Sequence, residues 1–170
     1  MLRAAGFEAY AAMTMAHERI DDIPADQFNH SVAVVKRHDG TLQPLDPTWV
    51  PNVRELWSSA EQQQGYLPGT PQGTTLQVTP LSPAQDHYIK INCTSQITKE
   101  GTLIAHLVIT AEGQSDKAVR GVFNARKSEW IRNLETEILR IEPSAFISSI
   151  NTTDPERYLE QPVTIVYDFT

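Results

Sequence analysis

Polar and apolar positions alternate most clearly in the second half of the chain. The segments 86–97 and 102–111 both alternate, and Lys99-Glu100-Gly101 between them is a typical turn sequence. Alternation places successive side chains on opposite faces of a strand, so one face of each segment is apolar. We therefore expect these two segments to pair as an antiparallel β-hairpin.

A different period follows between residues 116 and 141. Apolar residues recur there at spacings of three, four and seven, which indicates an amphipathic helix that Ser115 caps and Pro143 ends. The segments 144–151 and 162–169 then supply two more strands. The pattern predicts a β-β-α-β-β layer, in which one long helix packs on an antiparallel sheet. The charged residues of this helix are interpreted as an ordinary solvated face: Arg120, Arg126, Lys127, Glu129, Arg132, Glu135 and Glu137.

The first half of the chain predicts a separate sheet. The segment 7–16 is mainly apolar and lacks glycine, which is typical of a strand whose two faces are both largely covered. Residues 17–27 are polar and predict a loop. Residues 30–37 and 41–46 then form a hairpin. The predicted fold class is therefore α+β, with an antiparallel hairpin preceding the β-β-α-β-β layer.

The turn of this hairpin decides which side chains share a face. A three-residue loop at His38-Asp39-Gly40, with its glycine in the left-handed conformation, places Arg37 opposite Thr41. Asp46 is then the diagonal neighbour of His30 on the same face. A two-residue turn would shift the pairing by one and place these two side chains on opposite faces. We expect the three-residue loop.

The segment 47–83 is rich in Pro, Gly, Gln and Thr and predicts an irregular wrap over the first sheet. Trp49 and Trp57 are expected to anchor it. Together with Tyr66 they allow two interpretations, a groove for an extended peptide or sugar and simple aromatic anchors of the wrap. The end of this segment reads as a linker, so the chain is divided into residues 1–80 and 81–170.

Composition limits the classes of function. Of the 170 residues, 40% are hydrophobic and 21% charged, as in globular proteins with a packed core. A net charge of −7 argues against nucleic acid as a partner, since phosphate binding needs a basic surface. No apolar run approaches the roughly 20 residues that cross a bilayer. The single cysteine, Cys93, excludes an internal disulfide. His17 lies in an acidic loop that matches no metal-ligand spacing, so a solvated loop is expected and no cofactor or metal is predicted.

His30 and Asp46 are the candidate catalytic residues. An imidazole takes a proton from a nucleophile, and a carboxylate on its other nitrogen fixes the tautomer that can do so. The alternative interpretation gives them no chemistry. It makes His30 the first residue of a strand and Asp46 part of the turn that ends one.

Three motifs add a resemblance to a family. Gly6-Phe7-Glu8-Ala9, Phe28-Asn29-His30 and Leu45-Asp46-Pro47-Thr48 resemble the C-terminal part of the catalytic core of bacterial transglutaminase-like proteins, in the papain-like cysteine superfamily. The resemblance covers about residues 1–80 and implies that His30 is the base and Asp46 its orienting carboxylate. The remainder resembles the sheet-rich region of an envelope-associated subgroup, which implies a periplasmic or cell-envelope location.

The nucleophile of that family is missing from this chain. The resemblance places it on a helix upstream of Leu2, and the residues up to Gly6 read as the last turn of such a helix. We therefore expect a fragment of a cysteine-dependent acyl-transfer or peptide-hydrolysing protein, inactive in this form. Cys93 is not expected to substitute, because a buried or half-buried position in a strand is predicted for it. Apolar surface left uncovered on the first sheet predicts a homo-oligomer.

Two other functions remain open at this stage. The second half and the aromatic wrap could form a non-catalytic module that binds a protein or a cell-envelope ligand, with His30 and Asp46 as a structural relic. The chain could also be a structural domain with no site of its own. A protein or peptide substrate is expected only in the first interpretation.

Overall fold

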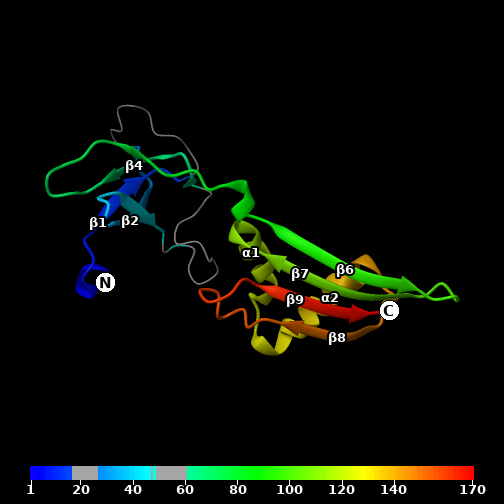
Figure 1. Cartoon of the computed structure of the whole chain (residues 1–170). Helices are drawn as coiled ribbons and strands as arrows, with labels where there is room; N and C mark the ends of the chain where they lie inside the picture. The colour runs from blue at the N-terminus through cyan, green and yellow to red at the C-terminus, as the bar shows by residue number, and fades with distance from the viewer. Residues whose placement is uncertain (17–26, 47, 49–60) are drawn as a thin grey trace. The chain divides into compact units, whose positions relative to one another are not determined.

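The computed structural model describes residues 1–16, 27–46, 48 and 61–170. They belong to two compact units, of which the first ends at Pro83 and the second comprises Ala84–Thr170. Each unit contains an antiparallel sheet, and the α-helices of the described residues both belong to the second unit (Figure 1). The predicted α+β class is confirmed. Trp49, Trp57 and the His17 loop lie outside the described residues.

The first unit is built on a five-stranded sheet in the part of the chain that is described, with the order β3-β2-β1-β4-β5. All neighbouring strands are antiparallel. Its strands are β1 (Ala9–Thr14), β2 (His30–Lys36), β3 (Leu42–Leu45), β4 (Gly65–Pro68) and β5 (Gln77–Val78). The 3₁₀ helix Arg3–Ala5 precedes β1 and ends at Gly6, whose φ is 89°.

The hairpin of β2 and β3 has the predicted register. Ala33 lies opposite Leu45, and the Arg37 N–H donates to the Thr41 carbonyl at 2.8 Å. Gly40 has a φ of 85°, the left-handed conformation that a three-residue loop requires at this position. The three-residue loop is therefore confirmed, and with it the face that His30 shares with Asp46.

One face of the first sheet carries its core. Ala12, Val32, Val34 and Tyr66 are buried there and form one hydrophobic cluster. The opposite face is open, since Met13 is 40% exposed. The expectation that both faces of the segment 7–16 are covered is therefore wrong. Its burial alternates along the strand, and its alanines made an alternating pattern look continuously apolar.

The second unit has the predicted β-β-α-β-β order. Its described strands form a four-stranded sheet in the order β6-β7-β9-β8. The strands are β6 (Ile89–Ile97), β7 (Leu103–Ala111), β8 (Ile147–Thr152) and β9 (Thr164–Phe169). The strand that comes last in sequence, β9, therefore lies in the interior of the sheet, between β7 and β8.

The predicted continuous helix is instead two helices, α1 (Gly113–Arg120) and α2 (Trp130–Ile141). The prediction failed because Phe123 and Trp130 are spaced as in a helix but meet across a bend. Their rings pack edge to face at 5.5 Å, and the Trp130 indole N–H donates to the Phe123 and Ala125 carbonyls. Ser115 lies inside α1 rather than at its cap. No helix in the described part of the chain combines the length and apolar character that a membrane crossing requires.

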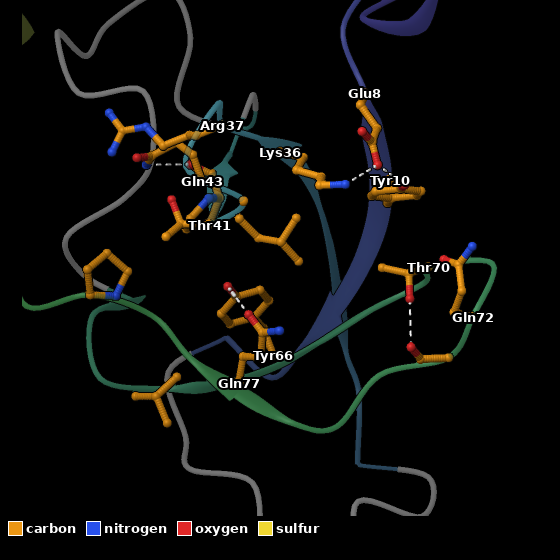
Figure 2. Close-up of a pocket in the computed structure, with 16 residues that line it drawn as sticks. Glu8, Tyr10, Lys36, Arg37, Thr41, Gln43, Tyr66, Thr70, Gln72 and Gln77 are labelled. Atoms are coloured by element: carbon orange, nitrogen blue, oxygen red, sulfur yellow. Dashed lines mark hydrogen bonds and ion pairs between the residues drawn. The ribbon is translucent and has the colours of Figure 1, made fainter.

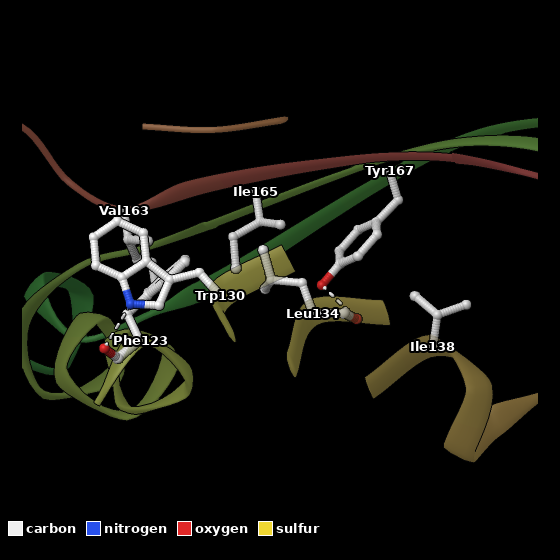
Figure 3. Packing of buried hydrophobic residues seen from close by; sticks show 8 residues of the cluster. Phe123, Trp130, Leu134, Ile138, Val163, Ile165 and Tyr167 are labelled. Carbon is white, nitrogen blue, oxygen red and sulfur yellow. Dashed lines mark hydrogen bonds between the residues drawn. The ribbon is translucent and has the colours of Figure 1, made fainter. Parts of the chain in front are cut away.

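The core of the second unit lies between α2 and the sheet. Leu134 and Ile138 point from α2 toward Ile165 and Tyr167 of β9 (Figure 3). Leu134 is 1% exposed and Tyr167 2% exposed. Burial of this apolar stripe is what holds the short helix in place, because a 12-residue helix is marginal by itself in water.

The outer strand β6 leaves an apolar strip uncovered on the face that carries the core. Residues of β6 on this face are exposed, although the β7 residues opposite Ile89, Ile91 and Cys93 belong to the core or pack against it. Leu103, opposite Ile97, is exposed as well. We call this set the β6 strip: Ile89, Ile91, Cys93, Ile97 and Leu103. The predicted buried or half-buried position of Cys93 is wrong, since the residue is exposed.

A buried ion pair joins α1 to the segment that precedes β9. Asp116 is 0% exposed and Arg120 4% exposed, and the Arg120 Nε donates to Asp116 Oδ2 at 2.5 Å. The Arg120 guanidinium also donates to the carbonyls of Pro155 and Gln161, and the Val163 N–H donates to Asp116. The interpretation of Arg120 as part of a solvated face is therefore wrong.

Candidate functional site

His30, Asp46 and Glu61 meet at one end of the first sheet. His30 is the first residue of β2, Asp46 directly follows β3, and Glu61 precedes β4. Because neighbouring strands are antiparallel, β1, β3 and β5 end where β2 and β4 begin. This end of the sheet therefore gathers side chains from segments that are distant in sequence.

His30 and Asp46 are in direct contact. The His30 Nε2 lies 3.2 Å from Asp46 Oδ2. The Asp46 side chain is 2% exposed and the His30 side chain 23% exposed, so water reaches the imidazole but hardly the carboxylate. The predicted contact on a shared face is confirmed, whereas the catalytic roles of the two residues stay predictions.

Asp46 is held in place from its other oxygen. The Thr48 N–H donates to Oδ1 at 2.9 Å, which closes a turn directly after β3. Burial raises the pKa of Asp46, but hydrogen bonds from the Thr48 hydroxyl and N–H and from His30 outweigh it, so the pKa lies below its usual value. Asp46 is therefore an ionised carboxylate at neutral pH, fixed in orientation before anything binds.

Glu61 is a third member of the group that the sequence did not reveal. Its Oε1 lies 3.8 Å from the His30 Nε2, and its side chain is 6% exposed. Each of the three side chains offers one atom, and these atoms lie within 4.8 Å of one another. No motif marks Glu61, and only its position just before the strand at 65–68 could have suggested a place at this end of the sheet.

The backbone around Glu61 is anchored by Thr79. The Thr79 hydroxyl donates to the Glu61 carbonyl at 2.5 Å, and it accepts the Gln64 N–H at 2.9 Å. Two backbone hydrogen bonds join the same two segments, from the Gln63 N–H to the Thr79 carbonyl and from the Thr79 N–H to the Gln64 carbonyl. Thr79 is itself 6% exposed, so this turn is fixed by buried interactions.

A pocket of about 620 Å³ lies on the first unit and extends from Lys36 and Glu8 to Tyr66 and Gln77. Tyr66 lies along one side, with its hydroxyl donating to Gln77 at 2.9 Å, and Lys36 contacts Glu8 across from it (Figure 2). Tyr66 is only 3% exposed, so it anchors the core and presents little aromatic surface. Many of the lining groups are polar: Glu8, Lys36, Arg37, Gln43, Gln72 and Gln77.

The remaining sequence candidates do not join this site. Cys93 lies on β6 in the second unit. His106 pairs with Asp168 on the second sheet, with Nδ1 2.7 Å from Oδ1, and both side chains are about half exposed. Hydrogen bonds from Ser149 and His106 lower the pKa of Asp168. This pair is a useful reference for His30.

Comparison with known proteins does not name a family. No family model matches the sequence, and no curated protein and no solved structure is significantly similar to it. The function is therefore argued from the geometry of the site.

Proposed function

We propose that His30 and Asp46 are the base and the orienting carboxylate of a transglutaminase-like site for cysteine-dependent acyl transfer or peptide hydrolysis. Cys93 lies on an exposed strand, whereas a reactive thiolate is favoured at a helix N-terminus. The proposal therefore assigns the thiol to a cysteine outside these 170 residues. The chain by itself should then show no covalent turnover.

The observation that supports this role is which ring nitrogen faces Asp46. A carboxylate 3.2 Å from Nε2 favours the tautomer that carries its proton on Nε2. The lone pair then lies on Nδ1, for which no hydrogen-bond partner is found within the described ranges. A general base needs such a lone pair, and the carboxylate on the opposite nitrogen stabilises the imidazolium that forms.

The proposed reaction follows from these positions. Nδ1 of His30 accepts the thiol proton, and the thiolate attacks a glutamine or peptide carbonyl to give a tetrahedral intermediate. The intermediate expels ammonia or an amine, which takes the proton back from His30, and a thioester remains. A second amine or water, deprotonated by the same nitrogen, then releases the acyl group and restores the thiol.

The decisive experiment measures acyl transfer by the protein expressed from its complete reading frame. A glutamine peptide and a fluorescent primary amine report transfer, and loss of the intact peptide reports hydrolysis. His30→Ala and Asp46→Ala should each lower kcat/KM by at least about 100-fold, the typical contribution of general-base catalysis. His106→Ala is the matched control and should leave activity unchanged. A wild-type protein without either activity, or one whose activity does not depend on His30, refutes the proposal.

The tautomer can be tested on the 170-residue chain itself. Long-range ¹H–¹⁵N NMR correlations distinguish a protonated from an unprotonated ring nitrogen. His30 should be unprotonated at Nδ1, and His106 should be unprotonated at Nε2, because its Nδ1 faces Asp168. Asp46→Asn should disturb the His30 tautomer and leave that of His106 unchanged. A wild-type His30 with its proton on Nδ1 contradicts the assigned role.

The pocket of the first unit favours a second candidate, a non-catalytic module that binds a protein or cell-envelope ligand. Its volume of about 620 Å³ lies within the range of small-ligand sites, and its amide and charged lining suits a polar peptide or sugar. Titration with glutamine-rich peptides and with peptidoglycan fragments, followed by NMR, tests this. Shifts confined to Gln43, Gln72 and Gln77 that disappear in Gln77→Leu support binding, and unchanged spectra at millimolar ligand exclude it.

A further inference from the structure

We propose that His30, Asp46 and Glu61 form a zinc-binding site. One imidazole nitrogen and two carboxylate oxygens converge there from three separate segments of the first unit. The inference goes beyond the proposed acyl-transfer function and does not depend on it, because it rests on the third side chain, Glu61, which that function does not use.

The separations of the two carboxylate oxygens from the His30 nitrogen suit zinc, and all three donor atoms lie within 4.8 Å of one another. With bonds of about 2.0–2.1 Å, tetrahedral zinc places its ligand atoms roughly 3.4 Å apart. The His30 Nε2 lies 3.2 Å from the Asp46 oxygen and 3.8 Å from the Glu61 oxygen. Shifts of a few tenths of an ångström, within the reach of side-chain torsions, bring both distances to this value.

The chemistry of the donors also favours zinc over harder cations. Mg²⁺ and Ca²⁺ prefer sites made of oxygen alone, whereas imidazole nitrogen combined with carboxylate oxygen suits zinc. A dication bound by a neutral imidazole and two carboxylates gives a site with no net charge, which is favourable at a buried position. Three protein ligands leave a fourth position for water, as in open zinc sites.

Both carboxylate side chains are largely shielded from solvent. Asp46 is 2% exposed and is fixed by the Thr48 N–H. Glu61 is 6% exposed, and its backbone is fixed by Thr79. The Thr48 hydrogen bond orients the Asp46 carboxylate, as supporting hydrogen bonds to metal ligands do, and the Thr79 hydrogen bond fixes the backbone from which the Glu61 side chain extends.

Zinc binding excludes the proposed catalytic state. The ion takes the lone pair of Nε2, which leaves the proton on Nδ1 and breaks the hydrogen bond to Asp46. Nδ1 then cannot accept a proton from a thiol. Zinc is therefore expected to inhibit acyl transfer wherever that activity is found, although zinc binding can be measured without it.

Isothermal titration of the chain with Zn²⁺ tests the proposal. The Cys93→Ser variant is the reference protein, because an exposed thiol binds zinc by itself. We expect one ion for each chain with micromolar affinity. His30→Ala, Asp46→Asn and Glu61→Gln should each weaken binding by at least about tenfold, since even residues that only support metal ligands have effects of this size.

Two controls make the result decisive. His106→Ala removes the exposed His–Asp pair of the second unit and should leave the affinity unchanged. NMR of the reference protein needs no variant at the site, so it remains valid even if Glu61→Gln fails to fold. Zinc should move the His30 ring signals and shift its proton to Nδ1. Absence of binding at millimolar zinc, or binding that leaves the His30 ring unchanged, overturns the proposal.

Discussion

Replacement of Asp116 by alanine is the sharpest test of the second unit. The variant leaves the Arg120 guanidinium in place at 4% exposure, without the carboxylate that Nε contacts at 2.5 Å. It also removes the acceptor of the Val163 N–H, a group fully enclosed at the start of β9. The two carbonyls of Pro155 and Gln161 still accept from Arg120, but they do not neutralise its charge.

The expected loss is large relative to the stability of a small domain. Removal of one partner of a buried ion pair destabilises a protein by about 3–5 kcal/mol, because the other charge stays buried. Total stabilities are about 5–15 kcal/mol, so Asp116→Ala should bring the second unit close to unfolding at room temperature. The control is Glu137→Ala, which removes an exposed pair with Arg140 and should change stability by less than about 1 kcal/mol.

Urea denaturation followed by Trp130 fluorescence measures both effects, in a background where Trp49 and Trp57 are replaced by phenylalanine so that Trp130 is the one fluorescent tryptophan. The urea concentration at the midpoint should fall sharply for Asp116→Ala, while the slope of the free energy against urea concentration stays unchanged. An unchanged slope means that the variant loses stability without a change in the surface exposed on unfolding. The double variant with Arg120→Met should lose less than the sum of the two single variants, because it leaves no buried charge. A loss below about 1 kcal/mol for Asp116→Ala would show that the pair does not hold this unit together.

Three further predictions concern backbone, pH and surface. Gly113→Ala should lower the free energy of unfolding in urea by at least about 2 kcal/mol, because the φ of Gly113 is +60° and an added Cβ would lie 2.2 Å from the His87 ring. Gly121→Ala is the control and should leave this free energy unchanged, because an added Cβ meets nothing within 4 Å. Burial raises the pKa of Tyr167 to about 12, so the folded state keeps a proton that the unfolded chain loses near pH 10. The free energy of unfolding should therefore be unaffected below pH 10 and fall by up to about 3 kcal/mol between pH 10 and 12. Denaturation measured across this pH range should show no such fall for Tyr167→Phe. The exposed β6 strip is a second apolar surface that self-association would cover, in addition to the first sheet. Light scattering should therefore report a homo-oligomer, and Ile91→Lys should reduce its population. A strictly monomeric wild-type protein at high concentration contradicts this prediction.

The hairpin of the first unit could be derived from sequence because its determinants are local. Gly40 tolerates the left-handed conformation, and the loop it closes sets the partner of every residue on β2 and β3. The same register places His30 and Asp46 on one face of the sheet. The Thr48 N–H donates to the carboxylate of Asp46, two residues earlier in the chain, so this contact also depends on local sequence.

The parts that were missed depend on partners distant in sequence. The position of Arg120 in a helical pattern suggests a solvated side chain, and nothing nearby indicates that the carbonyls of Pro155 and Gln161 enclose it. Glu61 joins His30 only because β1 and β4 lie side by side in the sheet. The spacing of Phe123 and Trp130 fits an unbroken helix as well as it fits two helices around a bend. Periodicity reports which face is apolar, and it does not report how far a helix continues.

The order of strands in the second sheet has a consequence for synthesis of the protein. β9 follows β8 in sequence, yet it lies between β7 and β8 and pairs with both. A ribosome produces β6, β7, the helices and β8 before β9. Until β9 emerges, β8 has no neighbouring strand to pair with. The core also lacks Val163, Ile165 and Tyr167 until β9 emerges. The core that the helices form with β7 therefore stays incomplete until β9 emerges, and this interval is when the nascent chain most needs protection from aggregation.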